Sequence, residues 1–393
     1  MTTSQDRDTL PESVEGLQII DTDSHYTEPA DLWTRNASAS IRSRVPQVRR
    51  IDGEDRWVIE GDQDWGQIGL CVVASDGSKM KGRLSFTRFD EMNRAASDPA
   101  GRLAMLDRQG IQYQILYPNA AGFQANKFLA IEDRAFALEI LKLYNTGMAE
   151  VQEQSGGRLL PQALIPEWDM GECVKEMQRC HDLGFTGFTI GEKPELQGLA
   201  DFTEPHWEPF WDFCNETGRV VNFHIGGSTA FNPFAVPWQS YGPERALAVA
   251  AISMYTSNAT TIANLCYSGL FDKYDKLKIT SVESGAGWIP FVLEALEYQL
   301  DEMIPTEMRH VKRRPTEYFQ DHIWASVWFE SKTLQPSIEL LGPEKFMFMT
   351  DFPHPTCLYP EPVSRVAAAV GDSPEKLRLV MQDNAAKLYG IAV

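Results

Sequence analysis

Three stretches of the sequence carry acidic and imidazole side chains at the end of apolar runs. Asp23 and His25 stand two residues apart in DTDSH, His224 ends the run VVNFH, and Asp351 ends the run FMFMTD. Side chains two positions apart on a strand project to the same side, so Asp23 and His25 can act together. Two carboxylates and two imidazoles around one point suit a divalent transition metal, with zinc, manganese and iron as candidates.

Two further groups follow the same pattern. Glu283 ends the run LKITSVE before the loop SGAG, and His354 lies three residues after Asp351 in DFPHP. The Glu283 carboxylate could act as a general base if its pKa were raised towards neutrality, or it could be a further metal ligand. It could also simply hydrogen-bond the glycine loop. His354 and the N–H groups of that loop are candidates for holding an oxyanion.

Each of these residues alone also has an ordinary structural explanation. Asp23 could cap the segment that follows it, and Asp351 could organise a proline turn. His25 and His224 could each be a packed histidine. The metal hypothesis therefore depends on the meeting of several strand ends in space, because burying one such group without a partner is costly.

Eight short apolar runs alternate with segments of helical periodicity, as in parallel βαβ units. The runs cover residues 18–23, 113–117, 159–165, 187–190, 220–225, 277–283, 322–328 and 346–351, and helices are predicted over 133–154, 170–183, 207–218, 288–303 and 373–388. The simplest α/β architecture for this order is a (β/α)8 TIM barrel. An open, doubly wound sheet is the alternative, although no GxGxxG or GxxxxGK[ST] motif follows an early strand.

The first two predicted strands are unusually far apart, since the first ends at residue 23 and the second begins at residue 113. An insertion after strand 1 lies on the face where barrel active sites are found. We therefore predict that residues from about 40 to 100 form a lid or substrate wall, with an oligomer contact as the alternative. Within it, RWVIEG at 56–61 predicts one arm of a hairpin, and 89–110 predicts a helix. Residues 1–16 are expected to be a flexible N-terminal arm, and 17–393 a single domain.

Composition narrows the class of protein. The chain has 393 residues, a formal charge of −19 and 43% hydrophobic residues, which predicts a globular protein without nucleic-acid or anionic-membrane partners. It has no 18-residue apolar window, and its N-terminus lacks the apolar core of a signal peptide. The six cysteines show no CxxC spacing. These features predict a cytoplasmic protein that acts on a small molecule.

The sequence resembles the amidohydrolase-related family (amidohydrolase 2), which includes aminocarboxymuconate semialdehyde decarboxylase and related decarboxylases and hydrolases. The resemblance rests on IIDTDSHYTEPADLW at 19–33, NFHIGG at 222–227, SVESGAGWIPFVLE at 281–294 and FMTDFPHP at 348–355. It implies a distorted (β/α)8 TIM barrel with one divalent metal ion, zinc being the first choice. The implied ligands are Asp23, His25, His224 and Asp351. Relatives are often dimers, so the resemblance also implies a homodimer or higher homo-oligomer.

The sequence departs from the usual family pattern at Asp23, where His or Glu is common, and at Glu283, where the related decarboxylases have His. The second departure leads us to predict a metal-dependent hydrolase that acts on an aromatic or ring-derived substrate. Asp351 or Glu283 would then deprotonate a metal-bound water. In the alternative, a non-oxidative decarboxylase, Asp351 or Glu283 would protonate the ring carbon as CO₂ leaves. A barrel that binds a ligand without turnover is disfavoured, because ligands on three strands are intact.

Aromatic and basic residues near the predicted strand ends are candidates for substrate binding. Trp33, Trp288 and Phe352 could form the wall of a pocket for an aromatic substrate, although each could equally pack in the core. Arg88 and Arg83, in the insertion, are candidates for binding a substrate carboxylate.

Overall fold

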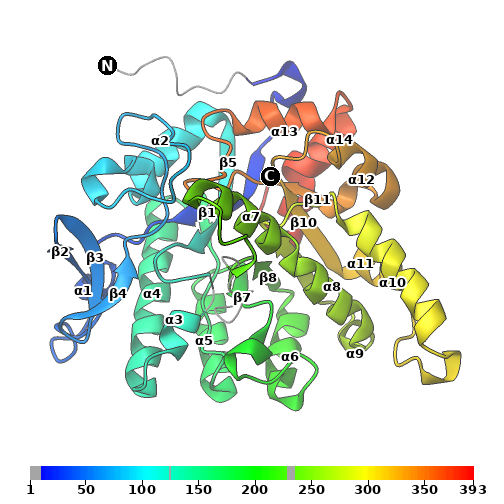
Figure 1. The fold of residues 1–393 in the computed structure, drawn as a ribbon, viewed down its shortest axis with the longest axis horizontal. Helices are drawn as coiled ribbons and strands as arrows, with labels where there is room; N and C mark the ends of the chain where they lie inside the picture. The colour runs from blue at the N-terminus through cyan, green and yellow to red at the C-terminus, as the bar shows by residue number, and fades with distance from the viewer. Residues whose placement is uncertain (1–9, 124, 228–234) are drawn as a thin grey trace.

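The computed structural model describes residues 10–123, 125–227 and 235–393, which form a mixed α/β fold built on parallel strands (Figure 1). Each of the eight apolar runs overlaps one of these strands. They are β1 (Ile19–Tyr26), β5 (Ile111–Pro118), β6 (Leu159–Pro161), β7 (Gly187–Ile190), β8 (Val220–His224), β9 (Lys278–Val282), β10 (Ile323–Val327) and β11 (Phe346–Phe348).

These strands form two parallel sheets, in the orders β1-β5-β6 and β11-β10-β9-β8-β7. Backbone hydrogen bonds join the sheets at both ends. Ala163, just after β6, forms a parallel bridge with Phe188 of β7. At the other junction the Asp351 N–H donates to the Asp23 carbonyl at 2.9 Å, and the His25 N–H donates to the Phe352 carbonyl at 2.7 Å. The ends of β1 and β11 are therefore held against each other.

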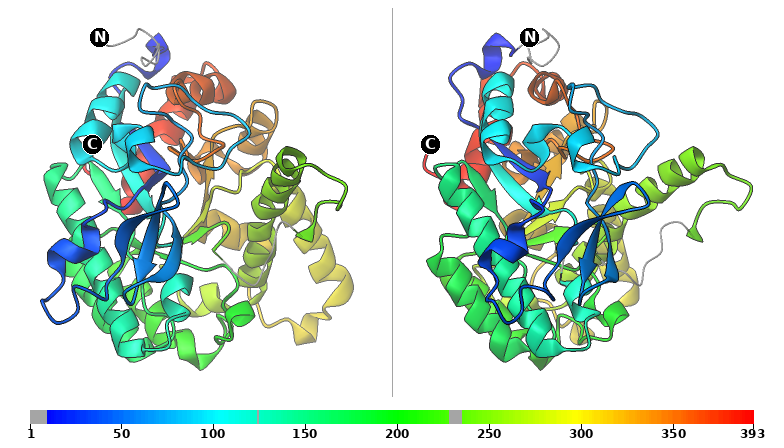
Figure 2. Two further views of the ribbon diagram at one scale, coloured as in Figure 1. Left: turned by 60° about the vertical axis from the view of Figure 1, so that its left-hand side comes forward. Right: turned by 90° about the vertical axis from the view of Figure 1, so that its left-hand side faces the viewer.

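Helices lie on the outside of these strands (Figures 1 and 2). They are α1 (Leu32–Asn36), α2 (Pro99–Gln109), α3 (Asn126–Leu129), α4 (Arg134–Gln154), α5 (Met170–Asp182), α6 (Glu208–Thr217), α7 (Pro243–Tyr255), α8 (Ser257–Tyr267), α9 (Leu270–Lys273), α10 (Ile289–Met303), α11 (Pro315–His322), α12 (Leu334–Leu341), α13 (Pro362–Val370), α14 (Pro374–Arg378) and α15 (Asn384–Tyr389). Aspartate caps begin α2, α4 and α5, where Asp98, Asp133 and Asp169 accept backbone N–H bonds. No helix in the described part of the chain combines the length and apolarity needed to cross a membrane.

The segment between β1 and β5 contains a small antiparallel sheet of β2 (Gln47–Ile51), β3 (Glu54–Ile59) and β4 (Gln63–Gln67). The predicted hairpin arm is β3, which pairs with both neighbours. The helix predicted over 89–110 is shorter than expected. It begins at Pro99 because the Asp98 side chain caps it and proline fits the first helical turn, whereas the preceding residues form short 3-10 turns.

Candidate metal centre

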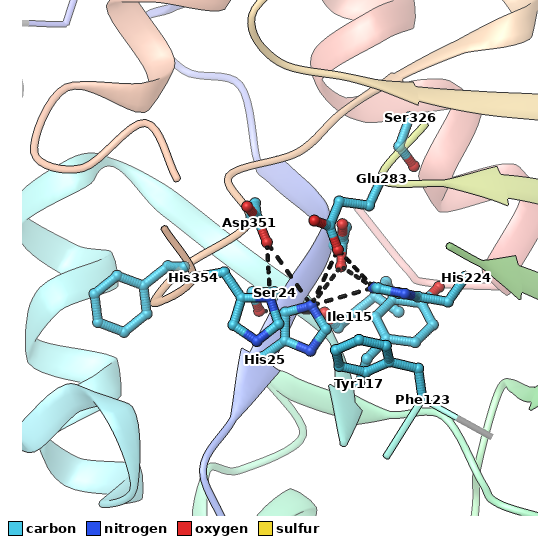
Figure 3. A network of polar contacts seen from close by, with 12 residues as sticks. Ser24, His25, Ile115, Tyr117, Phe123, His224, Glu283, Ser326, Asp351 and His354 are labelled. Carbon is cyan, nitrogen blue, oxygen red and sulfur yellow. Dashed lines mark hydrogen bonds and ion pairs between the residues drawn. The ribbon is translucent and has the colours of Figure 1, made fainter. Parts of the chain in front are cut away.

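Acidic and imidazole side chains from four strand ends lie close together (Figure 3). They form two overlapping groups of possible metal ligands: Asp23, His25, His224 and Glu283 are one, and His25, Glu283, Asp351 and His354 are the other. The His25 and His224 Nε2 atoms are 3.1 Å apart, and Asp23 Oδ1 lies 3.7 Å from each. Glu283 Oε2 is 3.1 Å from His224 Nε2, and Asp351 Oδ1 is 3.8 Å from His25 Nε2. All of these residues are buried. The predicted meeting of the strand ends is therefore observed, and Glu283 belongs to the same cluster.

The far nitrogens of both imidazole rings are fixed by the backbone. His25 Nδ1 lies 2.8 Å from the Pro118 carbonyl, and His224 Nδ1 lies 2.8 Å from the Ile225 carbonyl. A carbonyl oxygen only accepts, so each Nδ1 carries the hydrogen, and in the neutral ring each Nε2 carries a lone pair. This arrangement presents two nitrogen donors to one position between the carboxylates.

Three carboxylate oxygens of the cluster lack the hydrogen bonds expected of buried polar atoms. Both Asp23 oxygens and Asp351 Oδ1 are buried without a hydrogen-bond partner. Burial raises the pKa of Asp23 to about 7. The nearby His224 opposes this shift, and repulsion from Glu283 and Asp351 adds to it. Burial and the Glu283 charge also raise the pKa of Asp351. A divalent cation would satisfy these oxygens together with the two nitrogens, so this donor set fits a metal ion.

Two of the carboxylates sit on strained backbone. Glu283 has φ +54° and Asp351 has φ +60°, in the left-handed region that side chains other than glycine rarely adopt. Glu283 directly follows β9, which ends at Val282. Asp351 lies three residues after β11, which ends at Phe348. Such strain persists where the surrounding structure holds it, and it concentrates at functional sites. Here it accompanies the placement of two carboxylates in the cluster.

Two rings flank the histidines. His354 stacks on His25 with ring centroids 3.5 Å apart, and its Nδ1 lies 3.3 Å from Asp351 Oδ1. Burial lowers the pKa of His354 to about 3, so this ring is neutral near pH 7. The Phe123 ring, which the sequence analysis did not single out, lies 4.4 Å from the His224 ring. Phe123 follows β5 outside any regular element, where hydrophobic periodicity gives no signal.

A buried arginine supports β1 from behind the cluster. Arg102 donates to the His25 carbonyl at 2.6 Å, to Gln114 Oε1 at 2.7 Å and to the Ala95 carbonyl at 2.5 Å. Its guanidinium also lies 4.7 Å from the Phe352 ring centroid. Burial lowers the pKa of Arg102 to about 10, which still leaves it charged at pH 7. The residue thus ties α2 to the strand that carries Asp23 and His25.

A cavity of about 300 Å³ opens beside the cluster. Glu283 and His354 line it, as do Arg83 and Leu84 from the β1–β5 segment and a series of residues on α7. Asp23 and Asp351 are fully buried and are not among the lining residues. Glu283 is therefore the carboxylate of this cluster that faces the cavity.

The four residues predicted to bind substrate do not line the cavity. Each of them instead contacts other residues of the protein. Trp33 is buried in the core and donates to the Ile140 carbonyl. Trp288 donates to the Ser284 carbonyl, and Phe352 packs beneath the Arg102 guanidinium. Arg88 is paired with Asp90.

Comparison with known proteins assigns the family. The sequence profile described as Amidohydrolase matches residues 20–391, so the chain belongs to the amidohydrolase family. Gamma-resorcylate decarboxylase from Rhizobium sp. (strain MTP-10005) is 30% identical over 259 residues, which are 64% of this chain and 76% of that protein. The resemblance inferred from the sequence motifs is therefore confirmed.

Two solved structures have a similar fold. An amidohydrolase from Mycobacterium avium subsp. paratuberculosis K-10 has a TM-score of 0.74 at 21% identity, covering 95% of this chain and all of that one. A dihydroxybenzoic acid decarboxylase from Polaromonas sp. JS666, with bound manganese and the inhibitor 2-nitroresorcinol, has a TM-score of 0.59 at 18% identity. That match covers 95% of this chain and 97% of the other.

These comparisons contradict the prediction of a hydrolase. The curated relative from Rhizobium is a decarboxylase, which favours the alternative reaction. The prediction rested on Glu283 standing where related decarboxylases have His. That inference was wrong because a carboxyl group and an imidazole can both hold and deliver a proton, so the exchange does not distinguish the reactions.

Proposed function

We propose that this protein is a metal-dependent, non-oxidative decarboxylase of an aromatic acid. The match to gamma-resorcylate decarboxylase over three quarters of that protein carries the proposal. The cluster around His25 and His224 supports it, because this donor set suits the divalent ion that the Polaromonas decarboxylase holds as manganese.

The proposed ligands are Asp23, His25, His224 and Asp351. Once bound, the ion would supply positive charge that orients and polarises an acidic substrate. Manganese and zinc both accept nitrogen and carboxylate donors, so either fits these four residues. The Arg102 contact with the His25 carbonyl helps to keep the strand end in place.

Glu283 is the proposed proton donor, because it lines the cavity and the two aspartates do not. In its acid form it delivers a proton to the ring carbon that bears the carboxylate. The ring-to-carboxylate bond then breaks, its electron pair returns to the ring, and CO₂ leaves. Glu283 regains its proton from water that enters the cavity. The neutral His354 ring can hydrogen-bond an oxygen of the acid, and Phe123 keeps water from the histidines.

We further propose that the eight parallel strands close into a distorted (β/α)8 barrel that forms one domain. The hydrogen bonds at both junctions between the sheets support closure. In this arrangement the β1–β5 insertion acts as a substrate wall, since Leu70, Arg83 and Leu84 line the cavity.

The proposal is tested by CO₂ release from a panel of hydroxylated benzoic acids, with manganese- or zinc-loaded protein and with chelator-treated protein. We expect CO₂ from at least one acid, loss of activity after chelation, and recovery when the metal is returned. No CO₂ from any acid with the metal-loaded protein would contradict the proposal.

A further inference from the structure

One face of α7 forms a wall of the cavity. Its lining residues are Glu244, Leu247, Ala248, Ala250, Ala251, Met254 and Tyr255, which recur at intervals of three and four. That spacing places them on one side of a helix. Apart from this face and its packing on α8, α7 stands out from the body of the molecule (Figure 2).

The cavity is larger than a single aromatic ring requires. A cavity of roughly 150 Å³ is enough to bind benzene. This one measures about 300 Å³, at the lower end of the range for pockets that take larger ligands. An aromatic acid with its carboxylate near Glu283 and His354 would therefore leave space of about one more ring unfilled.

Most of the remaining lining residues are apolar; the hydroxyl groups are those of Tyr255 and Thr356, and Thr356 donates to Asp351. Phe123, Ile225, Met254, Ala250 and Ala251 are lining residues that are buried or half-buried, whereas Ala248 is exposed and belongs to the outer end of the cavity. The other charged lining residues, Arg83 and Glu244, are both exposed and so belong to the outer end. A polar substituent on the aromatic acid, placed against these apolar residues, would lose hydrogen bonds to water without gaining new ones. An apolar substituent there would be stabilised by burial.

We infer that the substrate is an aromatic acid carrying an apolar ring or chain of about four carbons or more on the side away from its carboxylate, and that the Ala248–Ala251 face of α7 selects it. This inference rests on the proposed function for the position of the carboxylate. Because alanine side chains are short, the cavity is wide enough beside α7 to hold the apolar group. Larger residues at these positions would fill that space.

Binding and turnover of a matched series of acids test the inference. The probes are 2-hydroxybenzoate, 4-butyl-2-hydroxybenzoate and the similarly sized but polar 4-(3-hydroxypropyl)-2-hydroxybenzoate. Affinity for the manganese-loaded protein is measured by calorimetry, and CO₂ release is followed separately. We expect the butyl acid to bind at least about tenfold more tightly than 2-hydroxybenzoate, and the hydroxypropyl acid to lose most of that gain.

Variants of α7 locate the effect. Ala251→Phe is expected to remove the advantage of the butyl acid, and Ala248→Phe provides a second obstruction if the first variant does not fold. Ala246→Phe, on the same helix but outside the cavity lining, is the matched control and should keep the advantage. Equal affinities for the three acids, or an advantage that survives both obstructing variants, would overturn the inference even if CO₂ is released. An α7-dependent advantage without CO₂ release from any acid would support the inference and overturn the decarboxylase proposal.

Discussion

His25 and His224, which are 199 positions apart in the chain, face each other through nitrogens 3.1 Å apart. Both rings donate from their far nitrogens to backbone carbonyls. Burial opposes a charge on His224, but hydrogen bonds and charge from Asp23 and Glu283 raise its pKa well above the usual value, so its Nε2 holds a proton that it can donate to His25 Nε2. A divalent cation bound by both nitrogens would take the place of that proton. The pair is therefore the feature of the structure on which the metal proposal depends most.

Loss of either ring should abolish metal binding. We expect the wild type to bind about one equivalent of manganese or zinc and His224→Ala to lose nearly all of it, because one of the two nitrogen donors is removed. Plasma mass spectrometry of dialysed protein measures the metal content. His310→Ala, at an exposed position, is the control and should retain the metal. Equal metal content in the wild type and His224→Ala would contradict the ligand assignment.

Glu283 should be needed for turnover and not for metal binding. Glu283→Gln keeps the shape of the side chain but cannot deliver a proton, so we expect kcat to fall about 10²- to 10⁴-fold. Metal content should stay near the wild-type value. If instead the variant loses the metal together with activity, Glu283 is a ligand and the proposed assignment of roles is incorrect.

Backbone strain at Glu283 predicts a second, independent effect. Because glycine tolerates φ +54° and alanine does not, Glu283→Gly should have a free energy of unfolding about 1 kcal/mol higher than Glu283→Ala. Urea unfolding of the metal-free proteins measures the difference. At Glu153, near the end of α4, the same pair should show the opposite order, since glycine weakens a helix. The same order at both positions would argue against strain at Glu283.

Arg102 should stabilise the fold through its hydrogen bonds to main-chain carbonyls. Arg102→Met leaves several buried acceptors without donors, so we expect the free energy of unfolding to fall by at least about 2 kcal/mol. Arg94→Met, which removes a side chain that is 76% exposed, should change it by less than about 0.5 kcal/mol. Denaturant titration compares the two variants with the wild type, and similar small effects would contradict this account.

A buried acid away from the cluster gives a prediction about pH. Burial raises the pKa of Glu167 from 4.5 to about 8, and one of its oxygens is buried without a hydrogen-bond partner. The folded protein keeps this proton up to about pH 8, whereas the unfolded chain releases it near pH 4.5. Stability from this group is thus present below about pH 4.5 and is lost as the pH rises towards 8, by at most about 1.4 kcal/mol per pH unit.

Glu167→Gln should remove that dependence. We expect the variant to gain stability relative to the wild type between pH 5.5 and 8.5, as measured by urea unfolding at both values. Glu153→Gln, at an exposed position, should show no such gain. A constant difference between Glu167→Gln and the wild type across this range would refute the assignment of a raised pKa.

The sequence predicted the parts of the site that regular strands deliver. Asp23, His25 and His224 lie on or at the ends of β1 and β8, where apolar runs and two-residue alternation are easy to read. Glu283 and Asp351 follow strands just as regular. Because parallel strand ends meet at one edge, their order along the chain was enough to place them together.

Other parts of the site had no comparable signal. Phe123 lies in an irregular connection, in which no periodicity indicates the direction of a side chain. The α7 wall belongs to a helix that was not among those predicted. The rim tryptophan Trp33 was placed near the substrate from its position in the chain alone, whereas packing against Trp57 and Tyr144 holds it in the core. Arg102 was missed because an arginine in a helix is usually exposed, and only the tertiary fold supplies its buried acceptors.

The most direct test of the central claim follows the reacting carbon itself. Manganese-loaded protein would be incubated in D₂O with the preferred acid of the benzoate panel, and the products followed by NMR together with CO₂ release. We expect one deuterium on the ring carbon that carried the carboxylate, in amounts equal to the CO₂ formed, and loss of both signals in Glu283→Gln. Hydrolysis of an ester, lactone or amide by the same metal-loaded protein, with no CO₂ or ring deuterium from any acid, would contradict the account.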